Sequence, residues 1–390
     1  MVTEIGLERA TMGMFVVLFL GMAIDILMAR RASSGASAQK AIRRLVIRAP
    51  DDFHTHLRFG AMLQLVLPYT ASVFARFLVM PNAPAIRNAI NVAAYRGAIL
   101  RRSGWISEPL MTIKIDGETT VETIAAAQGS GAIAGKVYPD GVTTGSEGGV
   151  RNFRVLWPIL REMERLDMAL CLHAEMPGAY VIRREIECLV TVGEILDAFP
   201  RLRVVIEHIT TKETIAFVRA RRKHGKKIAA TITAHHLLRT LNDAIGSKVR
   251  VHEHCQPCAK GPEDRDALIE AATSGDPGFF FGSDTAPHAQ SLKECAEGCA
   301  GVFTAPVALP TLVEIFERAD KLDRLEDFVS RFGAEFYGLP LNVGTIVLEK
   351  RSWRVPRIVR SFFGWTRVVP WRAGELVTWQ VTQGTKRRKS

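Results

Sequence analysis

The sequence predicts an α/β fold, and within that class a (β/α)8 barrel of the TIM type. Three observations indicate this fold. The chain has 390 residues, 47% of them hydrophobic and 23% charged, which is ordinary globular composition and long enough for such a barrel. From Ala41 onward, short apolar runs alternate with helical patterns. These runs number eight, and their continuous apolar character is typical of parallel strands buried on both faces.

The expected strands follow one another along the chain without an internal repeat. They are residues 45–47, 77–80, 111–115, 134–138, 169–173, 203–208, 228–232 and 278–282. Residues 156–166 are expected to form a helix, because Leu156, Ile159, Leu160 and Met163 recur at helical spacing. Residues 213–222 and 263–272 show a similar pattern. We expect the barrel to span residues 41–345, followed by a basic C-terminal segment and tail at residues 346–390.

Residues 11–29 are apolar except for Asp25 and are followed by Arg30 and Arg31. Three interpretations stay open: a signal anchor, a cleavable targeting segment with a small-residue site at 36–38, or an extension without a role in the fold. A charge at mid-helix costs about 2.5 to 3.5 kcal/mol on insertion scales. Membrane contact is therefore not favoured. We predict a cytoplasmic enzyme over an organellar or membrane-anchored one, with residues 1–40 as an N-terminal extension.

The formal net charge is +11. A basic balance can indicate a nucleic-acid or lipid partner. Much of this charge, however, lies in arginines between residues 351 and 372 and in the run 386–389. Such runs commonly form a solvated face or tail, so no nucleic-acid partner is predicted. A positive field would also suit an anionic small-molecule substrate.

Six cysteines do not form the dense framework of a small secreted domain, which predicts free thiols in a reducing compartment. Cys255 and Cys258 have the spacing of half a zinc site. The candidate partners close in sequence, His252 and His254, would crowd the same loop. Free thiols are therefore favoured at this segment as well.

His54 and His56 stand two residues apart at an expected strand end. Side chains at this spacing on a strand point the same way, so the two imidazoles can bind one metal ion together. In a barrel the active site lies at the carboxyl ends of the strands. Polar or metal-competent residues recur at these ends, namely His54, His56, Asn82, Lys136, His173, His208 and Asp284.

Each of these residues alone has an ordinary explanation. His208 could be a hydrogen-bonded structural histidine, Asp284 could cap a helix, and Lys136 could extend out of the barrel. The joint pattern is harder to explain this way, because independent explanations would have to hold at several strand ends at once. The pattern therefore predicts a metal centre.

Seven sequence blocks make the prediction more specific. They are 50–58 (PDDFHTHLR), 79–82 (VMPN), 135–139 (GKVYP), 172–175 (LHAE), 207–212 (EHITTK), 282–288 (GSDTAPH) and 299–301 (CAG). With these blocks the chain resembles the dihydroorotases of the amidohydrolase superfamily, in their shorter bacterial-type form. The resemblance runs from about Pro50 to Tyr337, and the order and spacing of the blocks agree throughout.

The resemblance implies a metal-dependent barrel with two zinc ions. His54, His56 and Asp284 would bind one ion, His173 and His208 would bind the other, and carboxylated Lys136 would bridge them. A neutral lysine amine reacts with carbon dioxide to give a two-oxygen anion that can span two metals. Two such ions acidify a water and polarise a carbonyl. Asp284 would be the catalytic general base.

The reaction implied is the reversible cyclisation of N-carbamoyl-L-aspartate to L-dihydroorotate, a step of pyrimidine synthesis. The substrate carries a free carboxylate, for which Arg58 is the natural bidentate partner. As the family has them, Asn82 and His288 would lie beside Arg58. The main chain of Ala300 would also contact the substrate.

Two further segments complete the implied substrate site. Thr143 and Thr144 match a mobile loop in which paired threonines close over the substrate and exclude water. The segment 252–258 offers backbone contacts to the substrate ring, and Gln256 stands there in place of a more usual leucine or lysine. Phe59 and residues 145–149 also depart from the family pattern. We further expect a homodimer.

Two alternatives remain. The chain could be another cyclic amidase, such as a hydantoinase-like hydrolase, although Arg58, Asn82 and His288 together favour a carboxylated substrate. It could also be a non-catalytic barrel that serves as a scaffold. A scaffold, however, has no need of Lys136 or Asp284.

Overall fold

The computed structural model describes residues 42–104, 107–361 and 364–384. The chain divides into two compact units, Met1–Arg43 and Arg44–Ser390, and every element below belongs to the second. The predicted extension at residues 1–40, including the apolar run 11–29, lies outside the described residues. Within the described ranges, no helix has both the length and the apolar character needed to cross a membrane.

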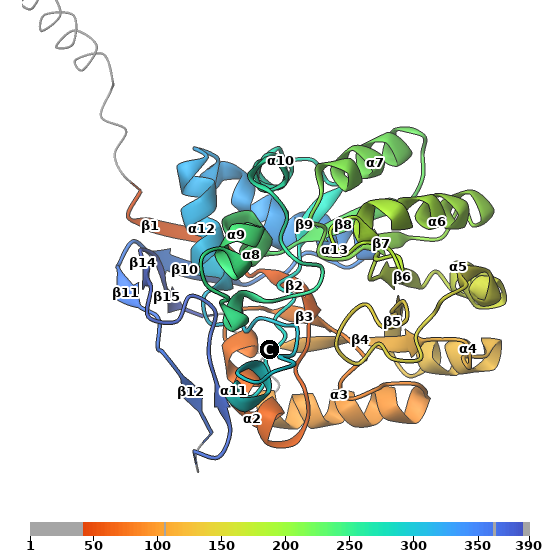
Figure 1. The fold of residues 1–390 in the computed structure, drawn as a ribbon, viewed down its shortest axis with the longest axis horizontal. Helices are drawn as coiled ribbons and strands as arrows, with labels where there is room; N and C mark the ends of the chain where they lie inside the picture. Colours follow the sequence, from red (N-terminus) through yellow and green to blue (C-terminus); the bar gives the residue numbers. More distant parts are fainter. Residues whose placement is uncertain (1–41, 105–106, 362–363, 385–390) are drawn as a thin grey trace, which may run out of the picture. The chain divides into compact units, whose positions relative to one another are not determined.

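Eight parallel strands form the central barrel (Figure 1). In order around the sheet they are β2 (Asp51–Thr55), β3 (Arg76–Val79), β4 (Glu108–Ile115), β5 (Ala132–Val137), β6 (Ala169–Leu172), β7 (Val204–Ile206), β8 (Ile228–Ile232) and β9 (Phe279–Phe281). Each strand pairs in parallel with the next one along the chain, as repeated β/α units require. The predicted (β/α)8 barrel is confirmed.

The barrel closes just beyond the ends of its first and last strands. The backbone N–H of Asp284 donates to the carbonyl of His54 over 2.9 Å, and the N–H of His56 donates to the carbonyl of Thr285 over 2.9 Å. Asp52 adds a side-chain connection, because its carboxylate accepts hydrogen bonds from the backbone N–H and the hydroxyl of Ser283 at 2.7 and 2.6 Å.

Helices connect the strands and cover the barrel (Figure 1). The longer helices are α2 (Gly60–Ala71), α3 (Ala89–Ser103), α4 (Val121–Gly129), α5 (Trp157–Arg165), α6 (Arg184–Ala198), α7 (Lys212–Lys223), α10 (Pro262–Thr273), α12 (Ala308–Arg318) and α13 (Phe332–Tyr337). Shorter helical segments are η1 (Phe153–Leu156), α8 (Ala234–Leu238), α9 (Leu241–Ile245), η2 (Val251–Glu253), α11 (Gln290–Lys293), η3 (Leu322–Arg324) and η4 (Asp327–Arg331). The three helices predicted at 156–166, 213–222 and 263–272 are confirmed as α5, α7 and α10.

One predicted barrel strand is wrong. Residues 45–47 do form a strand, β1 (Arg44–Arg48), but it pairs antiparallel with β10 (Thr345–Glu349), which in turn pairs with β15 (Gln380–Gln383). These three strands make a separate small sheet beside the barrel (Figure 1). The missing barrel strand is β2, whose polar sequence DDFHT does not look like a buried strand. The other seven predicted strands are confirmed.

The C-terminal region continues with two short antiparallel strand pairs, one nested within the other along the chain. Strand β11 (Trp353–Arg354) pairs with β14 (Leu376–Val377), and β12 (Val359–Arg360) pairs with β13 (Arg367–Val368). The division of the chain at residues 40 and 345 stays a prediction of the sequence.

The barrel interior is filled by apolar side chains. One buried cluster joins inward-facing residues of all eight strands, among them Leu78, Ala134 and Val205, to residues of α13. Within it, Phe53 stacks on Tyr337 of α13 with ring centroids 5.0 Å apart. Because this packing fills the interior, the polar side chains collect at the carboxyl ends of the strands, where barrel active sites lie.

Candidate active site

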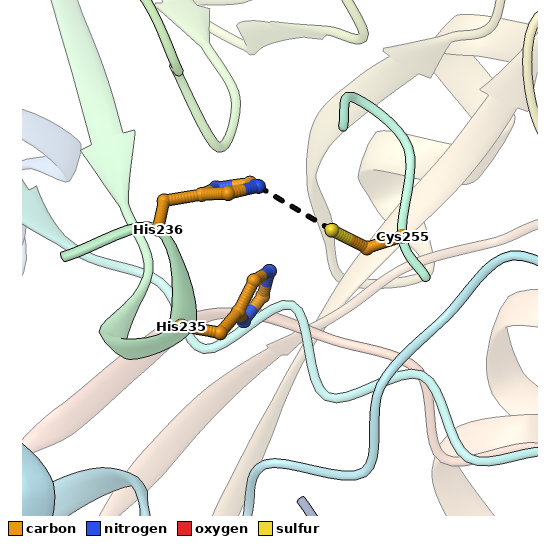
Figure 2. Close-up of side chains that lie close together, drawn as sticks. All are labelled: His235, His236 and Cys255. Atoms are coloured by element: carbon orange, nitrogen blue, oxygen red, sulfur yellow. Dashed lines mark hydrogen bonds between the residues drawn. The ribbon is translucent and has the colours of Figure 1, made fainter. Parts of the chain in front are cut away.

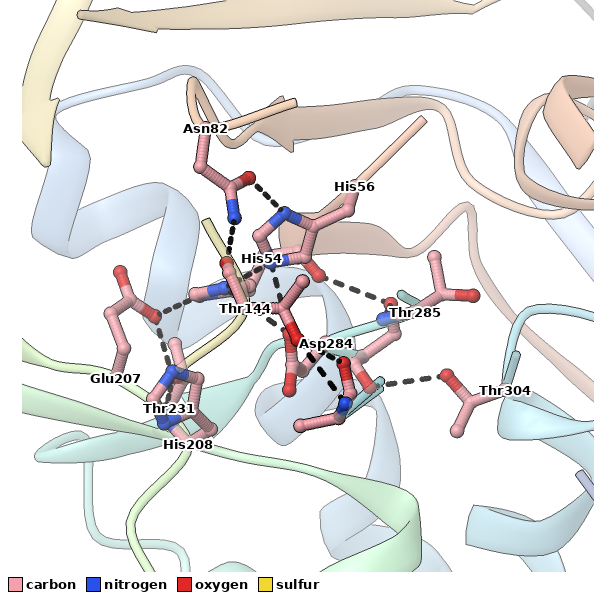
Figure 3. Close-up of polar contacts among 12 residues, drawn as sticks. His54, His56, Asn82, Thr144, Glu207, His208, Thr231, Asp284, Thr285 and Thr304 are labelled. Carbon is pink, nitrogen blue, oxygen red and sulfur yellow. Dashed lines mark hydrogen bonds and ion pairs between the residues drawn. The ribbon is translucent and has the colours of Figure 1, made fainter. Parts of the chain in front are cut away.

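The six predicted metal ligands come from five different strands. His54 lies in β2 and His56 directly follows it, Lys136 lies near the end of β5, and His173 directly follows β6. His208 and Asp284 follow β7 and β9 within a few residues. The structure brings these side chains together at the carboxyl end of the barrel, and all six are at most 6% exposed. Figure 3 shows His54, His56, His208 and Asp284.

One group of ligands consists of His54, His56 and Asp284. The Nε2 atoms of the two histidines are 3.3 Å apart. Oδ1 of Asp284 lies 3.5 Å from Nε2 of His54 and 3.1 Å from Nε2 of His56. Two imidazole nitrogens and a carboxylate oxygen that converge in this way form a donor set suited to a divalent transition metal.

The second group lies beside the first. The ring of His208 is 4.9 Å from that of His54 and 4.8 Å from that of His173, measured between centroids. Nζ of Lys136 lies 5.1 Å from the ring centroid of Tyr138. Lys136 is fully buried, and its Nζ has no hydrogen-bond partner among the described residues.

Carboxylates and an amide hold the histidine rings in place (Figure 3). Nδ1 of His54 lies 2.7 Å from Oε2 of Glu207, and Nε2 of His173 lies 2.7 Å from Oε2 of Glu175. Nδ1 of His56 lies 2.8 Å from Oδ1 of Asn82. Such outer partners fix the tautomer and orientation of a ligand histidine and raise its basicity.

Glu175, Glu207 and Tyr138 are not among the predicted site residues. The signal for both carboxylates was present, since Glu175 stands two residues after His173 and Glu207 directly precedes a second histidine. Tyr138 lines the pocket above the ligands, and its hydroxyl has no partner among the described residues. An aromatic residue two positions after Lys136 carries no comparable signal in the sequence.

Burial and charge set the protonation states of the site. Burial lowers the pKa of Lys136 and lowers that of His56 to about 4. Burial would raise the pKa of Asp284, but the hydrogen bond to His56 and the charge of His54 bring it below its usual value. Neutral amine, neutral imidazole and ionised carboxylate are the forms that carbamate formation and metal binding require.

Three site residues have a strained backbone. Arg58, His208 and Asp284 have positive φ angles of 62°, 41° and 44°, a region that non-glycine residues rarely adopt. Such strain persists where the surrounding structure imposes it, and it concentrates at functional sites. With this backbone conformation, the three side chains line the pocket from the loops that follow β2, β7 and β9.

The pocket above the ligands is polar and contains most of the predicted substrate residues. It is lined by His56, Arg58, Asn82, Tyr138, Thr143, Thr144, His173, His208, Gln256, Asp284, Ala286, Ala300 and Gly301. His54 and Lys136 lie outside this lining. His288 also stands outside it but contacts its wall, since Nε2 of His288 lies 3.1 Å from Nη2 of Arg58 and 3.0 Å from the carbonyl of Ala300.

The loop that carries the paired threonines lies across this pocket. The backbone N–H of Ala300 donates to Oγ1 of Thr144 over 3.1 Å, and the side-chain amide of Asn82 lies 3.5 Å from the carbonyl of Thr144. Thr143 is held by the hydroxyl of Ser146, which accepts from its backbone N–H over 2.9 Å. The loop therefore forms part of the pocket wall and is held there by contacts to Asn82 and Ala300.

The buried nitrogen atoms of the site are consistent in kind with ligands of a divalent transition metal such as zinc. Nζ of Lys136 and Nδ1 of His208 are buried nitrogen atoms without a hydrogen-bond partner in the described part of the chain. Buried polar groups are almost always paired, and an exception in a cluster of histidines and carboxylates points to a ligand. His208 lies directly beside the group of His54, His56 and Asp284, since its ring centroid is 4.9 Å from that of His54.

Comparison with curated proteins relates the whole barrel to one family, although no family model matches the chain. The chain is 43% identical over 343 residues to a dihydroorotase of Teredinibacter turnerae, which covers 86% of this chain and 98% of that protein. It is 44% identical over 345 residues to a dihydroorotase of Cupriavidus necator, with 87% and 99% covered.

Solved structures give the same relation. A dihydroorotase of Saccharomyces cerevisiae crystallised with 5-fluoroorotic acid matches with a TM-score of 0.84 and 31% identity, over 89% of this chain and 100% of that one. A dihydroorotase of Campylobacter jejuni matches with a TM-score of 0.80 and 35% identity, over 87% and 98%. An L-hydantoinase of Arthrobacter aurescens, with a TM-score of 0.72 and 14% identity over 89% and 87%, shares the fold. The chain therefore belongs to the dihydroorotase family of metal-dependent amidohydrolases, hydrolases that act on cyclic amides.

Proposed function

We propose that the chain catalyses the reversible cyclisation of N-carbamoyl-L-aspartate to L-dihydroorotate at a centre of two zinc ions bridged by carboxylated Lys136. The observation that carries this proposal is the position of Lys136. Its amine is fully buried among the ligand histidines, has no hydrogen-bond partner among the described residues, and has a lowered pKa. A buried ammonium without a partner is costly. A neutral amine at this position is ready to form a carbamate.

The ligand sets follow the two groups of side chains. His54, His56 and Asp284 would hold one ion, His173 and His208 would hold the other, and the carbamate of Lys136 would be shared. When bound, two such ions supply an acidified water and a polarised carbonyl.

Asp284 would carry the proton. Its carboxylate is ionised and points at the ligand cluster, where it can accept a proton from water and return it to the amide nitrogen of the ring. Its backbone is held by the bond from its N–H to the carbonyl of His54. A general base fixed in this way needs little reorganisation during the reaction.

Arg58, Asn82 and His288 would bind the substrate carboxylate. The guanidinium of Arg58 is held by a 2.8 Å hydrogen bond from its Nε to the carbonyl of Pro287, which leaves its terminal nitrogens for the substrate and His288. Thr143 and Thr144, with the main chain around Gln256 and Ala300, would cover the ring. A half-buried arginine in the lining of a polar pocket favours an anionic substrate over the neutral rings of a hydantoinase.

The test uses purified protein with L-dihydroorotate and follows ring opening with and without a chelator. We expect turnover that the chelator abolishes and zinc restores. Dihydrouracil, which lacks the carboxylate, is the matched control and should react far more slowly. Equal rates on both rings would favour the hydantoinase-like alternative, and metal-free protein without turnover would favour the non-catalytic scaffold. The cytoplasmic location and the homodimer stay predictions of the sequence.

A further inference from the structure

A second cluster of potential metal ligands lies next to Gln256, a residue of the active-site pocket lining. His235 and His236 stand in the short helix α8, and Cys255 lies in the segment that follows η2 (Figure 2). One ligand atom from each residue, two imidazole nitrogens and the thiol sulfur, lies within 4.8 Å of the others. All three side chains are buried, and none has a role in the proposed reaction.

The local fold aims the three side chains at one another. Thr233 caps α8, because its hydroxyl accepts a 3.1 Å hydrogen bond from the backbone N–H of His236. Nε2 of His236 then lies 3.5 Å from Sγ of Cys255, a separation typical of two ligand atoms on one tetrahedral ion. The ring of His235 lies 4.3 Å from that of His236, between centroids, and faces the same sulfur (Figure 2).

His235 carries the inference, because neither of its ring nitrogens has a hydrogen-bond partner among the described residues. A neutral imidazole has one N–H and one lone pair, and both are buried here. Nδ1 of His236 also lacks a partner in the described part of the chain. Unpaired polar atoms this deep in a protein are rare and point to a ligand.

We propose that His235, His236 and Cys255 bind a zinc ion, distinct from the ions at the strand ends. Two imidazoles and one thiolate are a donor set that zinc, a borderline-soft ion, prefers over the oxygen-rich sets of calcium and magnesium. Burial raises the pKa of the Cys255 thiol, and coordination deprotonates such a thiol. A hollow lined by Ile245, Val249, Cys255 and Cys258 reaches one of the three proposed ligands, Cys255.

The ion would join two segments that shape the pocket. α8 follows β8 directly, whereas Cys255 is adjacent to Gln256, which lines the pocket above the ligands. Without an ion, Nε2 of His236 and Sγ of Cys255 lie 3.1 and 3.3 Å from the same acceptor, the carbonyl of Pro257. Zinc would replace this shared contact with bonds to both side chains, and it would fix the backbone at Cys255, next to Gln256.

Cobalt(II) substitution tests the site without reference to turnover. The full-length protein is stripped of metal, reconstituted with cobalt(II), and examined for a thiolate-to-cobalt charge-transfer band. No thiol belongs to the ligand sets at the strand ends, so the band reports only on this cluster. We expect the band in the parent protein, its loss in Cys255→Ser, and one bound cobalt fewer per chain in that variant.

Cys258→Ser is the matched control, because it removes a thiol of the same segment and should keep the band and the cobalt content. His235→Gln guards against a folding defect of Cys255→Ser. His235→Gln keeps the thiol. Its affinity for the cobalt ion that gives the band should fall by about tenfold or more. A parent protein without the band, a band that survives in Cys255→Ser, or unchanged affinity in His235→Gln would overturn the proposal. Loss of the metals at the strand ends would leave the band in place.

Discussion

Lys136 is the residue whose charge state matters most to the proposed metal centre. Its amine lies inside the barrel wall, where a charged ammonium would lose its hydration without gaining a partner among the described residues. As a carbamate it would instead carry a negative charge between two cations. Carboxylation would thus turn an unfavourable buried group into the proposed bridge of the site.

Replacing Lys136 by alanine should remove the bridge and most of the activity. We expect lower metal content by elemental analysis and turnover close to background. Short-chain carboxylic acids should restore part of the turnover, because their two oxygen atoms can occupy the place of the carbamate. Normal turnover and metal content in Lys136→Ala would contradict the bridging role.

Substitutions of Asp284 and Arg58 should affect different kinetic constants, kcat for Asp284 and KM for Arg58. Asp284→Asn should lower kcat by about 10² to 10⁴, the usual scale for general acid–base catalysis, while the protein keeps part of its metal. Arg58→Lys should mainly raise KM for dihydroorotate, because the planar fork that fits a carboxylate is lost. Steady-state kinetics of both variants check the assignment, which fails if the two phenotypes are interchanged.

Single residues differ in how well the sequence predicts their position. Residues such as His54 and Lys136 stand in dense motifs, and the fold brings them together as expected. The outer partner Glu207 was missed, because a carboxylate next to a histidine has no defined direction until the fold is known. For Cys255, a free thiol was favoured, and the candidate metal partners considered were His252 and His254 of the same loop. In the structure its neighbours are His235 and His236 of α8. The sequence does not show that α8 and the segment of Cys255 pack against each other.

At the scale of elements, the contact between β2 and the end of β9 holds the barrel closed. Asp52 is fully buried and accepts two hydrogen bonds from Ser283, and burial raises its pKa to about 6. A carboxylate in this position connects the first and last barrel strands through its side chain. The proposed ligand His54 lies two residues after Asp52, and the proposed ligand Asp284 directly follows Ser283.

Asp52→Ala should therefore destabilise the protein. The change leaves the buried N–H of Ser283 without its acceptor, which costs about 1 to 3 kcal/mol. Urea unfolding should show a lower midpoint than in the parent protein. Asp266→Ala is the control, because this exposed carboxylate of α10 pairs with its neighbour Arg265 on the surface and should change stability by less than about 0.5 kcal/mol. Equal midpoints for the two variants would contradict the role of Asp52.

Elements were predicted well where the chain is apolar and poorly where polar residues are buried. β3 to β9 follow from continuous apolar runs. β2 was missed because its buried residues Asp51, Asp52 and His54 are polar, and they are tolerated inside only because each finds a partner. β1 was correctly predicted as a strand, but its partner β10 lies almost 300 residues away in the sequence, and an apolar pattern does not identify a partner.

At the scale of the whole molecule, residues 1–40 should be dispensable for turnover. Every site residue lies within the compact unit Arg44–Ser390, and its first strand begins at Arg44. A variant that begins at Ala38 should be soluble and as active as the full chain. Loss of activity in that variant would contradict the dispensability of residues 1–40. Stable association of the full chain with membranes in alkaline carbonate would favour a membrane anchor at residues 11–29.

Metal removal should lower the thermal stability of the whole barrel. A ligand that binds only the folded state stabilises it by about 2.7 kcal/mol at a hundredfold excess over Kd. Scanning calorimetry of the chelator-treated protein should therefore show a Tm lower by several degrees. Added zinc should reverse the shift, and His56→Ala should respond less. An unchanged Tm after verified metal loss would show that the ions do not support the fold.

The closure of the barrel between β2 and β9 has a consequence for biosynthesis. His54 and His56 leave the ribosome early, whereas Asp284 is translated only after all the barrel strands. A nascent chain that still lacks Asp284 has two of the three ligands of the first group, and these sit at an open edge of the sheet. The complete donor set exists only once the last strand has docked against the first. Tight zinc uptake would then mark a finished barrel, and truncated translation products would compete poorly for the cell's zinc.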